Sequence, residues 1–194
     1  MPDLLQASAP FRSPESACGS CEIVPLDLDD ATFIALNLRA DDATEIYSIR
    51  DDDNPAALAR DVMACLAARG LGFCARLDGR PVAAFGVLEK WPAVYEAFAF
   101  ATDSFPKVGG RVTRFILREI APWLRARGAR RLQCHSHEDH WRAHRWLRFL
   151  GAQEEARLEC FGRDGSAYLI FAWTGEEADS DPEPVAARHA PSTR

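Results

Sequence analysis

The sequence contains no apolar run that approaches the roughly 20 residues needed to cross a bilayer. Its N-terminus also lacks a basic segment followed by an apolar stretch, which a secretion signal requires. An excess of positive charge is missing too, since the formal net charge is −6. Sequence-independent nucleic-acid binding draws most of its affinity from phosphate neutralisation, so this charge argues against it. We therefore expect a cytoplasmic protein with neither a membrane nor a nucleic acid as its partner.

Cysteines at metal-site spacing are scarce. Cys18 and Cys21 form a CxxC motif, but no second Cys or His pair lies at zinc-site spacing. We therefore assign this motif neither a metal nor a redox role. The other four cysteines stand singly among apolar or strand-like neighbours, where a free thiol behaves as a small hydrophobic group. We expect these four to be reduced core residues: Cys65, Cys74, Cys134 and Cys160.

The length of 194 residues and the apolar content of 47% suit one domain with its own core. Residues 1–20 are rich in Pro, Ser and Ala, and residues 175–194 are charged and proline-rich. Neither stretch has much to bury, so both are predicted to be disordered tails. The domain is expected over residues 21–174.

Residue patterns predict an α/β (α+β) domain with a mixed, mostly antiparallel sheet flanked by helices. Asp78-Gly79 and Asp164-Gly165 tolerate positive φ angles, so each is expected to turn a tight hairpin, the second of which closes the domain. The predicted strands are 21–25, 73–77, 82–88, 95–102, 130–135, 155–161 and 167–173. A long helix with an apolar stripe over 108–124 is predicted between the fourth and fifth strands, and Pro122 is expected to kink its end. A further helix is predicted over 139–150.

Side chains that cap helices mark three further helix starts near the N-terminus. Asp29 or Asp30 is expected to cap the first helix. Asp42 and Glu45, three residues apart, form a capping-box-like start for the second. Asn54, followed by a proline, is expected to cap the third.

This order of elements is similar to that of the GCN5-related acyltransferases, the GNAT fold, across residues 21–174. In that family the segment after the fifth strand reads NxxAxxxYxxxGF, and this chain has His140, Ala143, Leu147, Gly151 and Ala152 at the five positions. The family's loop-to-helix segment reads Q/RxxGxG/A, and Lys107, Gly110 and Val112 stand at its three positions. The resemblance implies acetyl transfer from acetyl-CoA, the co-substrate, to an amine acceptor.

Three segments also look like one branch of this family, the GNAT-like proteins of T7-type phages that are related to an internal virion protein. They are LNLRADDATEI, LDGRPVAAFGV and HRWLRFLGA, at 36–46, 77–87 and 144–152. This likeness implies an alternative function, a catalytically silent structural protein. Virion proteins are then its partners and the virion is its location.

A coenzyme A site is predicted at the start of the long helix. A helix N-terminus has unpaired N–H groups and a partial positive charge, and glycines let a pyrophosphate approach the backbone. Lys107, Arg111 and Arg114 add positive charge there, which is unfavourable unless an anion binds. The alternative is a solvated basic face that continues to Arg118 and Arg125. With the strand residues that the resemblance implies for pantetheine, the predicted cofactor-binding residues are Phe100, Ala101, Thr102, Lys107, Val108, Gly109, Gly110, Arg111, Val112 and His140.

Acyl transfer needs a base for the acceptor amine and an acid for the thiolate leaving group. The candidates for the base are Glu96 and Glu89, and His140 or His137 can substitute for them. The family's acid, a tyrosine, falls on Leu147, which cannot donate a proton. Leu147 and Val112 therefore favour a fold that binds without transferring, whereas the basic loop favours the enzyme.

The segment from His135 to His140 also matches HxHxDH, the metal-binding signature of metallo-β-lactamase-like hydrolases. That fold needs further ligands well downstream, and only His144 and His189 follow the motif. The nearby Arg142 and Arg145 add positive charge that repels a dication. We therefore expect no structural zinc and rank a metal-dependent hydrolase last.

Overall fold

The computed structural model describes residues 20–175. Nearly all of the two predicted tails, and Cys18 with them, lie outside the described residues. The structure has seven strands in one sheet: β1 (Cys21–Pro25), β2 (Gly70–Leu77), β3 (Arg80–Trp91), β4 (Val94–Ala101), β5 (Arg131–His137), β6 (Gln153–Leu158) and β7 (Tyr168–Thr174). Their order is β1-β2-β3-β4-β5-β7-β6, and β4 and β5 alone are parallel neighbours. The mixed, mostly antiparallel sheet is therefore confirmed.

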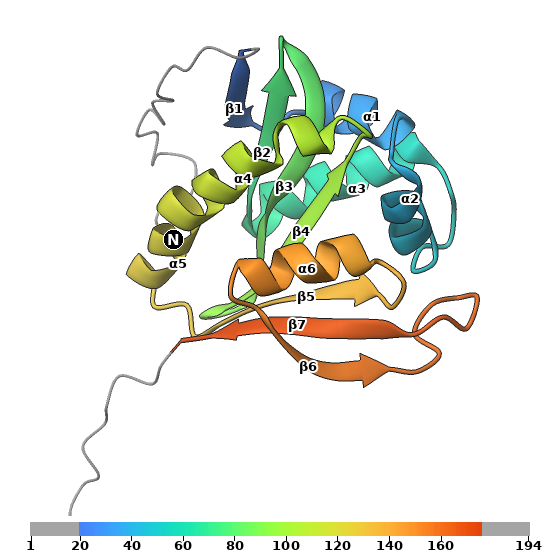
Figure 1. Ribbon diagram of the computed structural model, residues 1–194, viewed down its shortest axis with the longest axis vertical. Helices are drawn as coiled ribbons and strands as arrows, with labels where there is room; N and C mark the ends of the chain where they lie inside the picture. Colours follow the sequence, from blue (N-terminus) through green and yellow to red (C-terminus); the bar gives the residue numbers. More distant parts are fainter. Residues whose placement is uncertain (1–19, 176–194) are drawn as a thin grey trace, which may run out of the picture.

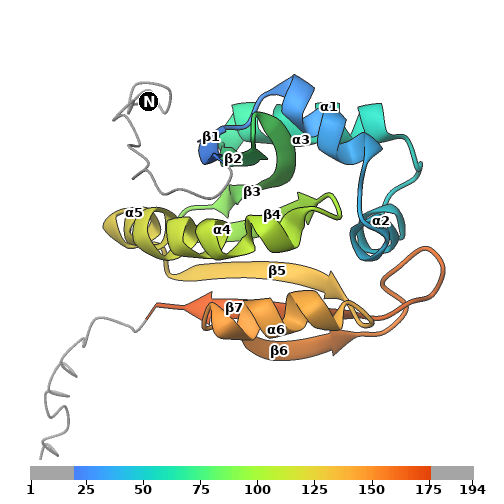
Figure 2. The same ribbon diagram turned by 45° about the horizontal axis from the view of Figure 1, so that its top comes forward.

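The helices pack on both faces of the sheet, as Figures 1 and 2 show. They are α1 (Leu28–Leu36), α2 (Ala40–Tyr47), α3 (Pro55–Arg69), α4 (Gly109–Phe115), α5 (Ala121–Ala126) and α6 (Trp141–Phe149). On one face, α1 and α3 bury an apolar cluster that includes Ile34, Ala59 and Phe100. On the other, α4 and α5 bury a cluster that includes Phe85 and Val112. α6 covers β5 and β7 through Leu147. No helix of residues 20–175 is long and apolar enough to cross a membrane.

The long predicted helix forms, and its irregularity lies before the proline. A π-helical turn, Ile116–Ile120, joins α4 to α5, and Pro122 sits in the first turn of α5. A proline has no N–H to donate to the preceding turn, and a helix tolerates that loss where its hydrogen-bond spacing is already altered. The change of hydrogen-bond spacing around Pro122 is therefore a wider turn just upstream of it.

The tight hairpin predicted at Asp78-Gly79 forms, whereas the one predicted at Asp164-Gly165 does not, because β6 ends at Leu158 and a longer connection leads to Tyr168, its partner on β7. Asp78 and Gly79 have φ angles of 51° and 76°, as a two-residue turn between twisted strands requires. At the second turn Gly165 has a φ of 85°, and Asp164 accepts hydrogen bonds from the main chain and hydroxyl of Ser166.

The predicted caps are right for one helix and wrong for two. Asn54 caps α3 by accepting the N–H groups of Ala56 and Ala57. α1 is capped by Asp27, upstream of the predicted residues, while Asp30 is buried and bonds Arg76. α2 begins after Arg39, and no side chain caps it. Asp42 and Glu45 make tertiary contacts instead, which pattern reading of a single helix does not foresee.

The cysteine prediction holds for two of the four residues. Cys74 and Cys134 are buried, as expected of small hydrophobic side chains. Cys65 and Cys160 are exposed, because α3 turns Cys65 away from the sheet and Cys160 stands in the turn after β6. Their apolar neighbours in sequence do not surround them in space.

Candidate functional site

The two parallel strands part shortly after they meet. β4 and β5 pair over three residue pairs, Val94–Glu96 with Arg131–Gln133, and no further pair follows in the described chain. A cavity of about 630 Å³ opens where they diverge. Its lining comes from both strands, from α2, α3 and α6 and from the π-helical turn. The site therefore lies at the middle of the sheet, where a ligand can insert between two strands.

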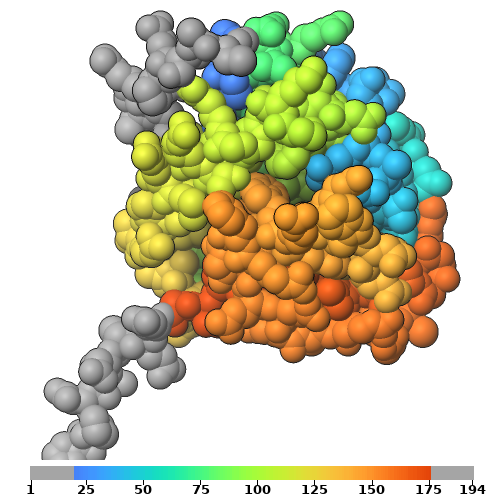
Figure 3. Space-filling model, in the orientation of Figure 1, coloured from blue at the N-terminus to red at the C-terminus, as the bar shows by residue number. Residues whose placement is uncertain are grey.

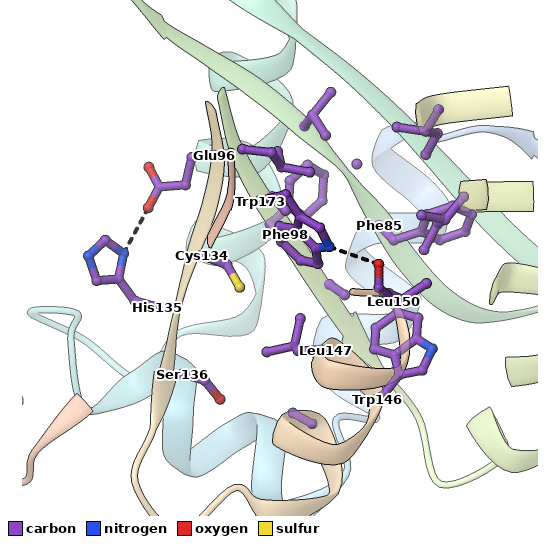
Figure 4. Close-up of a pocket in the computed structure, with 18 of the residues that line it drawn as sticks. Phe85, Glu96, Phe98, Cys134, His135, Ser136, Trp146, Leu147, Leu150 and Trp173 are labelled. Atoms are coloured by element: carbon purple, nitrogen blue, oxygen red, sulfur yellow. Dashed lines mark hydrogen bonds and ion pairs between the residues drawn. The ribbon is translucent and has the colours of Figure 1, made fainter. Parts of the chain in front are cut away.

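The cavity has one wall on each face of the sheet, because successive strand residues point to opposite faces. Figure 4 shows Glu96 and His135 pointing toward each other on one side of the strands, and Cys134 and Leu147 lying on the other. The first side is the face of α1 and α3. Phe98 and Phe100 stand two and four residues after Glu96, so they share its face, and both pack against these helices. The second is the face that α4 and α6 cover.

On the second face the cavity lies between α6 and the π-helical turn with α5, which contribute Ile116 and Leu124 to its lining. Figure 3 shows a hollow between α4 and α6 near the middle of the view. Trp146 of α6 spans it. Its Nε1 donates a 2.9 Å hydrogen bond to Oγ1 of Thr113 on α4, and its ring packs edge-on against Phe105 at 5.6 Å between centroids. Leu147, buried, lines the same wall.

The main-chain groups at the end of β4 are already bonded within the protein. The N–H of Ala101 donates to Oδ2 of Asp42 at 2.7 Å, and its carbonyl accepts the N–H of Arg39 at 3.0 Å. The N–H of Thr102 donates to the carbonyl of Val82 on β3. Because main-chain groups two residues apart face the same neighbouring strand, those of Phe100 also face β3. Ala97 and Ala99 are residues beyond the last β4–β5 pair whose main chains face the gap.

The start of α4 keeps an open surface. Within residues 20–175, the N–H groups of Gly109 and Gly110 have no recorded hydrogen-bond acceptor. A Cβ built on Gly110 meets nothing within 4 Å. Val108 and Val112 are both fully buried in the core, so neither side chain stands in front of the helix start. Lys107 is exposed beside it and lines a separate hollow with Thr102, next to α1.

Glu45 of α2 bonds to β5 at the end of the gap that lies farthest from the β4–β5 pairs. Its Oε2 accepts hydrogen bonds from Oγ of Ser136 and the N–H of His137, both at 2.7 Å, and lies 3.0 Å from Nδ1 of His140. Burial by itself raises the pKa of Glu45, but its bonds and charge interaction with His140, helped by Ser136 and His137, outweigh burial and lower it. Glu45 is therefore a carboxylate that ties α2 to β5.

Asp42 completes a buried charged cluster with Glu45. Its Oδ1 lies 2.8 Å from Nε of Arg39 and 3.5 Å from Nε2 of His140. Burial raises the pKa of Asp42, and the neighbouring Arg39 guanidinium opposes that rise. The Arg39 guanidinium also lies over the ring of Phe105, 4.9 Å from its centroid. The two carboxylates expected to cap α2 thus anchor it to both diverging strands.

The four clustered histidines point their ring nitrogens to different partners. His135 faces Glu96, and His140 lies between Glu45 and Asp42. Nδ1 of His137 accepts the N–H of Asp139, and Nε2 of His144 lies 3.0 Å from the carbonyl of His137. Among residues 20–175, no group of three His, Cys, Asp or Glu is arranged to hold a metal ion. The HxHxDH spacing therefore does not gather its imidazoles around one point.

Both oxygens of Glu96 have partners. Oε1 lies 3.1 Å from Nδ1 of His135, and Oε2 lies 2.9 Å from Nζ of Lys90. These bonds, that of His135 foremost, outweigh burial and lower the pKa of Glu96 to about 2. Glu89 pairs with Tyr95 across the β3–β4 hairpin and points to the opposite face, and it does not line the cavity.

The structure thus brings three predicted residues, Glu96, Phe100 and His140, to one cavity. It leaves outside the lining Glu89 and eight predicted cofactor-binding residues: Ala101, Thr102, Lys107, Val108, Gly109, Gly110, Arg111 and Val112. Sequence reasoning missed the role of Glu45 and the pairing of His135 with Glu96. The sequence carries one signal for Glu45, its spacing of three residues from Asp42. That spacing indicates a helix cap, since nothing in the sequence shows which strand lies opposite.

No family model and no curated protein matches this sequence. Solved structures do. The ribosomal-protein-S18-alanine N-acetyltransferase from Escherichia coli is 17% identical, with 84% of this chain and 99% of that chain covered and a TM-score of 0.62. An N-acetyltransferase from Staphylococcus aureus Mu50 is 12% identical, with 80% and 98% covered and a TM-score of 0.62. An acetyltransferase of the GNAT family from Streptococcus pneumoniae is 14% identical, with 80% and 99% covered and a TM-score of 0.59. Similarity at this level shows that the chain has the fold of these acetyltransferases.

Proposed function

From this GNAT acetyltransferase fold, we propose that the protein transfers an acetyl group from acetyl-CoA to an amine. The observation that carries the proposal is the divergence of β4 and β5 after three residue pairs, which opens the cavity at the centre of the sheet. A thioester placed between the strands is reached from the other face by an acceptor. Proximity of the two reactants in one cavity is a large part of what an acyl transferase must provide.

The coenzyme is proposed to lie between α4 and α6. Its pyrophosphate would meet the exposed start of α4, where Gly109 and Gly110 have N–H groups without a recorded acceptor in the described chain and where Lys107 adds charge. Its pantetheine would run along the gap, with the main chain of Ala99 as the nearest partner on β4. Ala101 is less suited, because Asp42 and Arg39 occupy its main-chain groups.

Two matched variants test this binding mode. Gly110→Ala adds a Cβ where nothing lies within 4 Å, so we expect it to bind acetyl-CoA like the wild type. Gly110→Glu adds a negative charge at the same place, and we expect at least tenfold weaker binding in titration calorimetry. Equal binding by the wild type and Gly110→Glu, or no binding by the wild type, would refute the site.

One observation favours a second candidate, a fold that binds without transferring. Leu147, at the position of the family's tyrosine, lines the cavity and has no proton to give to the thiolate. Thiol release from acetyl-CoA distinguishes the two functions. The acceptors to try are an arylalkylamine, a polyamine, free lysine and a peptide with N-terminal alanine, the last because the neighbour from Escherichia coli is named for that group. Binding of acetyl-CoA with no thiol release above the rate without protein would favour the silent fold.

A further inference from the structure

His135 is the polar side chain of β5 that lies at the start of the gap, two residues beyond the last β4–β5 pair. It points to the face of α1 and α3, opposite the proposed coenzyme, and it lines the cavity. About 23% of its side chain is exposed, so a small molecule can reach the ring. Its position is therefore that of a group facing an acceptor.

Only one of the two ring nitrogens of His135 has a hydrogen-bond partner within residues 20–175. Nδ1 lies 3.1 Å from Oε1 of Glu96, an arrangement in which Nδ1 carries the proton and donates it to the carboxylate. Nε2 then has a lone pair, and no partner for it is recorded within residues 20–175. Phe161 stacks on one face of the ring, with planes 8° apart and centroids 5.3 Å apart, which limits ring rotation. The imidazole is thus held in one tautomer and one orientation.

Glu96 itself is poorly placed to take a proton. His135 and Lys90 occupy its two oxygens and hold its pKa at about 2, far below the pH at which an amine is handled. A base works best when its pKa lies near the working pH, and a carboxylate held this low does not meet that condition. Glu96 therefore acts through the imidazole.

The wall around His135 on this face is apolar. Ile46, Val62 and Phe98 pack together there, and Ile49 and Phe161 stand exposed at the edge of the same cavity. An apolar wall favours the uncharged form of an amine, which eases its deprotonation. The carboxylates of Glu45 and Glu96 disfavour an anionic acceptor.

On these grounds, and resting on the proposed function, we propose that His135 is the general base that takes a proton from an acceptor amine carrying an apolar group, and that Glu96 positions it. Nε2 of His135 accepts one proton from the ammonium. The freed nitrogen lone pair forms the bond to the thioester carbon, and the C–S bond breaks to give the amide and coenzyme A thiolate. After transfer, the imidazolium and the remaining amine proton supply protons to the thiolate and to water.

The charged groups that bear on this imidazole come from several elements. Glu96 on β4 faces Nδ1 directly, with Lys90 of β3 behind it. On the same face of β5 lie His137 and Arg131, the latter paired with Glu155. Glu45 of α2 approaches from the far end of the gap through Ser136. Of these, Glu96 is the group in hydrogen-bond contact with the imidazole.

The test uses the full chain, acetyl-CoA and 2-phenylethylamine as the probe acceptor. We expect His135→Ala to lower kcat/KM about 100-fold, since general base catalysis contributes about 10²–10⁴-fold, and to leave acetyl-CoA binding unchanged. Added imidazole should restore part of the rate, which a structural role of His135 would not predict. Glu96→Gln should lower kcat less than His135→Ala does and leave KM for acetyl-CoA unchanged, because the amide oxygen still accepts the Nδ1 proton but carries no charge. Gln133→Ala, two residues back along the strand on the same face and outside the cavity lining, is the matched control.

The possible outcomes distinguish a failure of the general-base proposal from a failure of the proposed function. If the wild type neither binds acetyl-CoA nor releases thiol with any amine, the proposed function fails and the base with it. If the wild type transfers acetyl and His135→Ala transfers equally well, or its loss is not restored by imidazole, the base alone is overturned. A preference for putrescine over 2-phenylethylamine would overturn the apolar acceptor.

Discussion

Trp146 of α6 donates a hydrogen bond to Thr113 of α4, and this bond crosses the space proposed for coenzyme A. The same hydroxyl donates to the carbonyl of Gly109 at the start of α4. A ligand that enters between α4 and α6 must break the Trp146–Thr113 bond.

Trp146→Phe is therefore expected to strengthen acetyl-CoA binding. Phenylalanine keeps a ring against Phe105 and loses the hydrogen bond, so the protein no longer gives up that bond when the ligand enters. A hydrogen bond contributes about 1 kcal/mol net, which corresponds to about a fivefold lower Kd by titration calorimetry. Trp141→Phe, at an exposed position of the same helix outside the cavity lining, is the control. Weaker binding by Trp146→Phe would mean that the indole contacts the ligand instead.

Glu45→Gln is expected to destabilise the fold. The amide keeps one acceptor oxygen but loses the charge that serves Ser136, the His137 main chain and His140 at once. Hydrogen bonds to a charged group contribute about 1.5–3 kcal/mol, so we expect a loss of about 2 kcal/mol in the free energy of unfolding. Urea unfolding at pH 7 measures it. Glu154→Gln, at an exposed ion pair with Arg148, should change little, because exposed pairs contribute about 0–1 kcal/mol.

The ion pairs of Glu96 predict a pH dependence of stability. Its pKa is about 2 in the folded protein against an ordinary value of 4.5, so the folded state binds fewer protons than the unfolded state in this window. The stability that Glu96 contributes is complete above pH 4.5 and is lost as the pH falls toward 2. The difference in unfolding free energy between the wild type and Glu96→Gln should therefore shrink by about 1 kcal/mol between pH 6 and pH 3, after allowance for solvent screening. A constant difference across that range would contradict the assignment.

The cysteines should differ in their rates of alkylation. Thiolates react and thiols do not, and burial, aided by nearby carboxylates, raises the pKa of Cys74 and of Cys134 to about 12. Cys65 and Cys160 are exposed. Iodoacetamide at pH 8, followed by peptide mass spectrometry, should label the exposed pair first and the buried pair only on unfolding in urea. Early labelling of Cys134 would show that the cavity admits the reagent.

Local patterns determined most of the fold. Asn54 caps α3, and Asp78-Gly79 turns a hairpin, because each depends on neighbours a few residues away. The apolar stripe of the long helix and the alternation of β4 likewise follow from the periods of 3.6 and 2 residues. These features do not depend on which strand or helix packs opposite them. The sequence alone therefore predicts the order of elements and, with it, the resemblance to the GNAT fold.

The site was decided by contacts between distant residues. Glu45 and Asp42 have the spacing of a capping box, and only the packing of α2 against β4 and β5 shows that they bond Ala101, Ser136 and His137. His135 and Glu96 stand 39 residues apart, so no local pattern joins them. The divergence of β4 from β5, which creates the cavity, results from three-dimensional pairing that ends after Glu96. A one-dimensional sequence carries the identities of these groups, whereas their distances, shared burial and altered pKa values exist only once the strands and helices have packed.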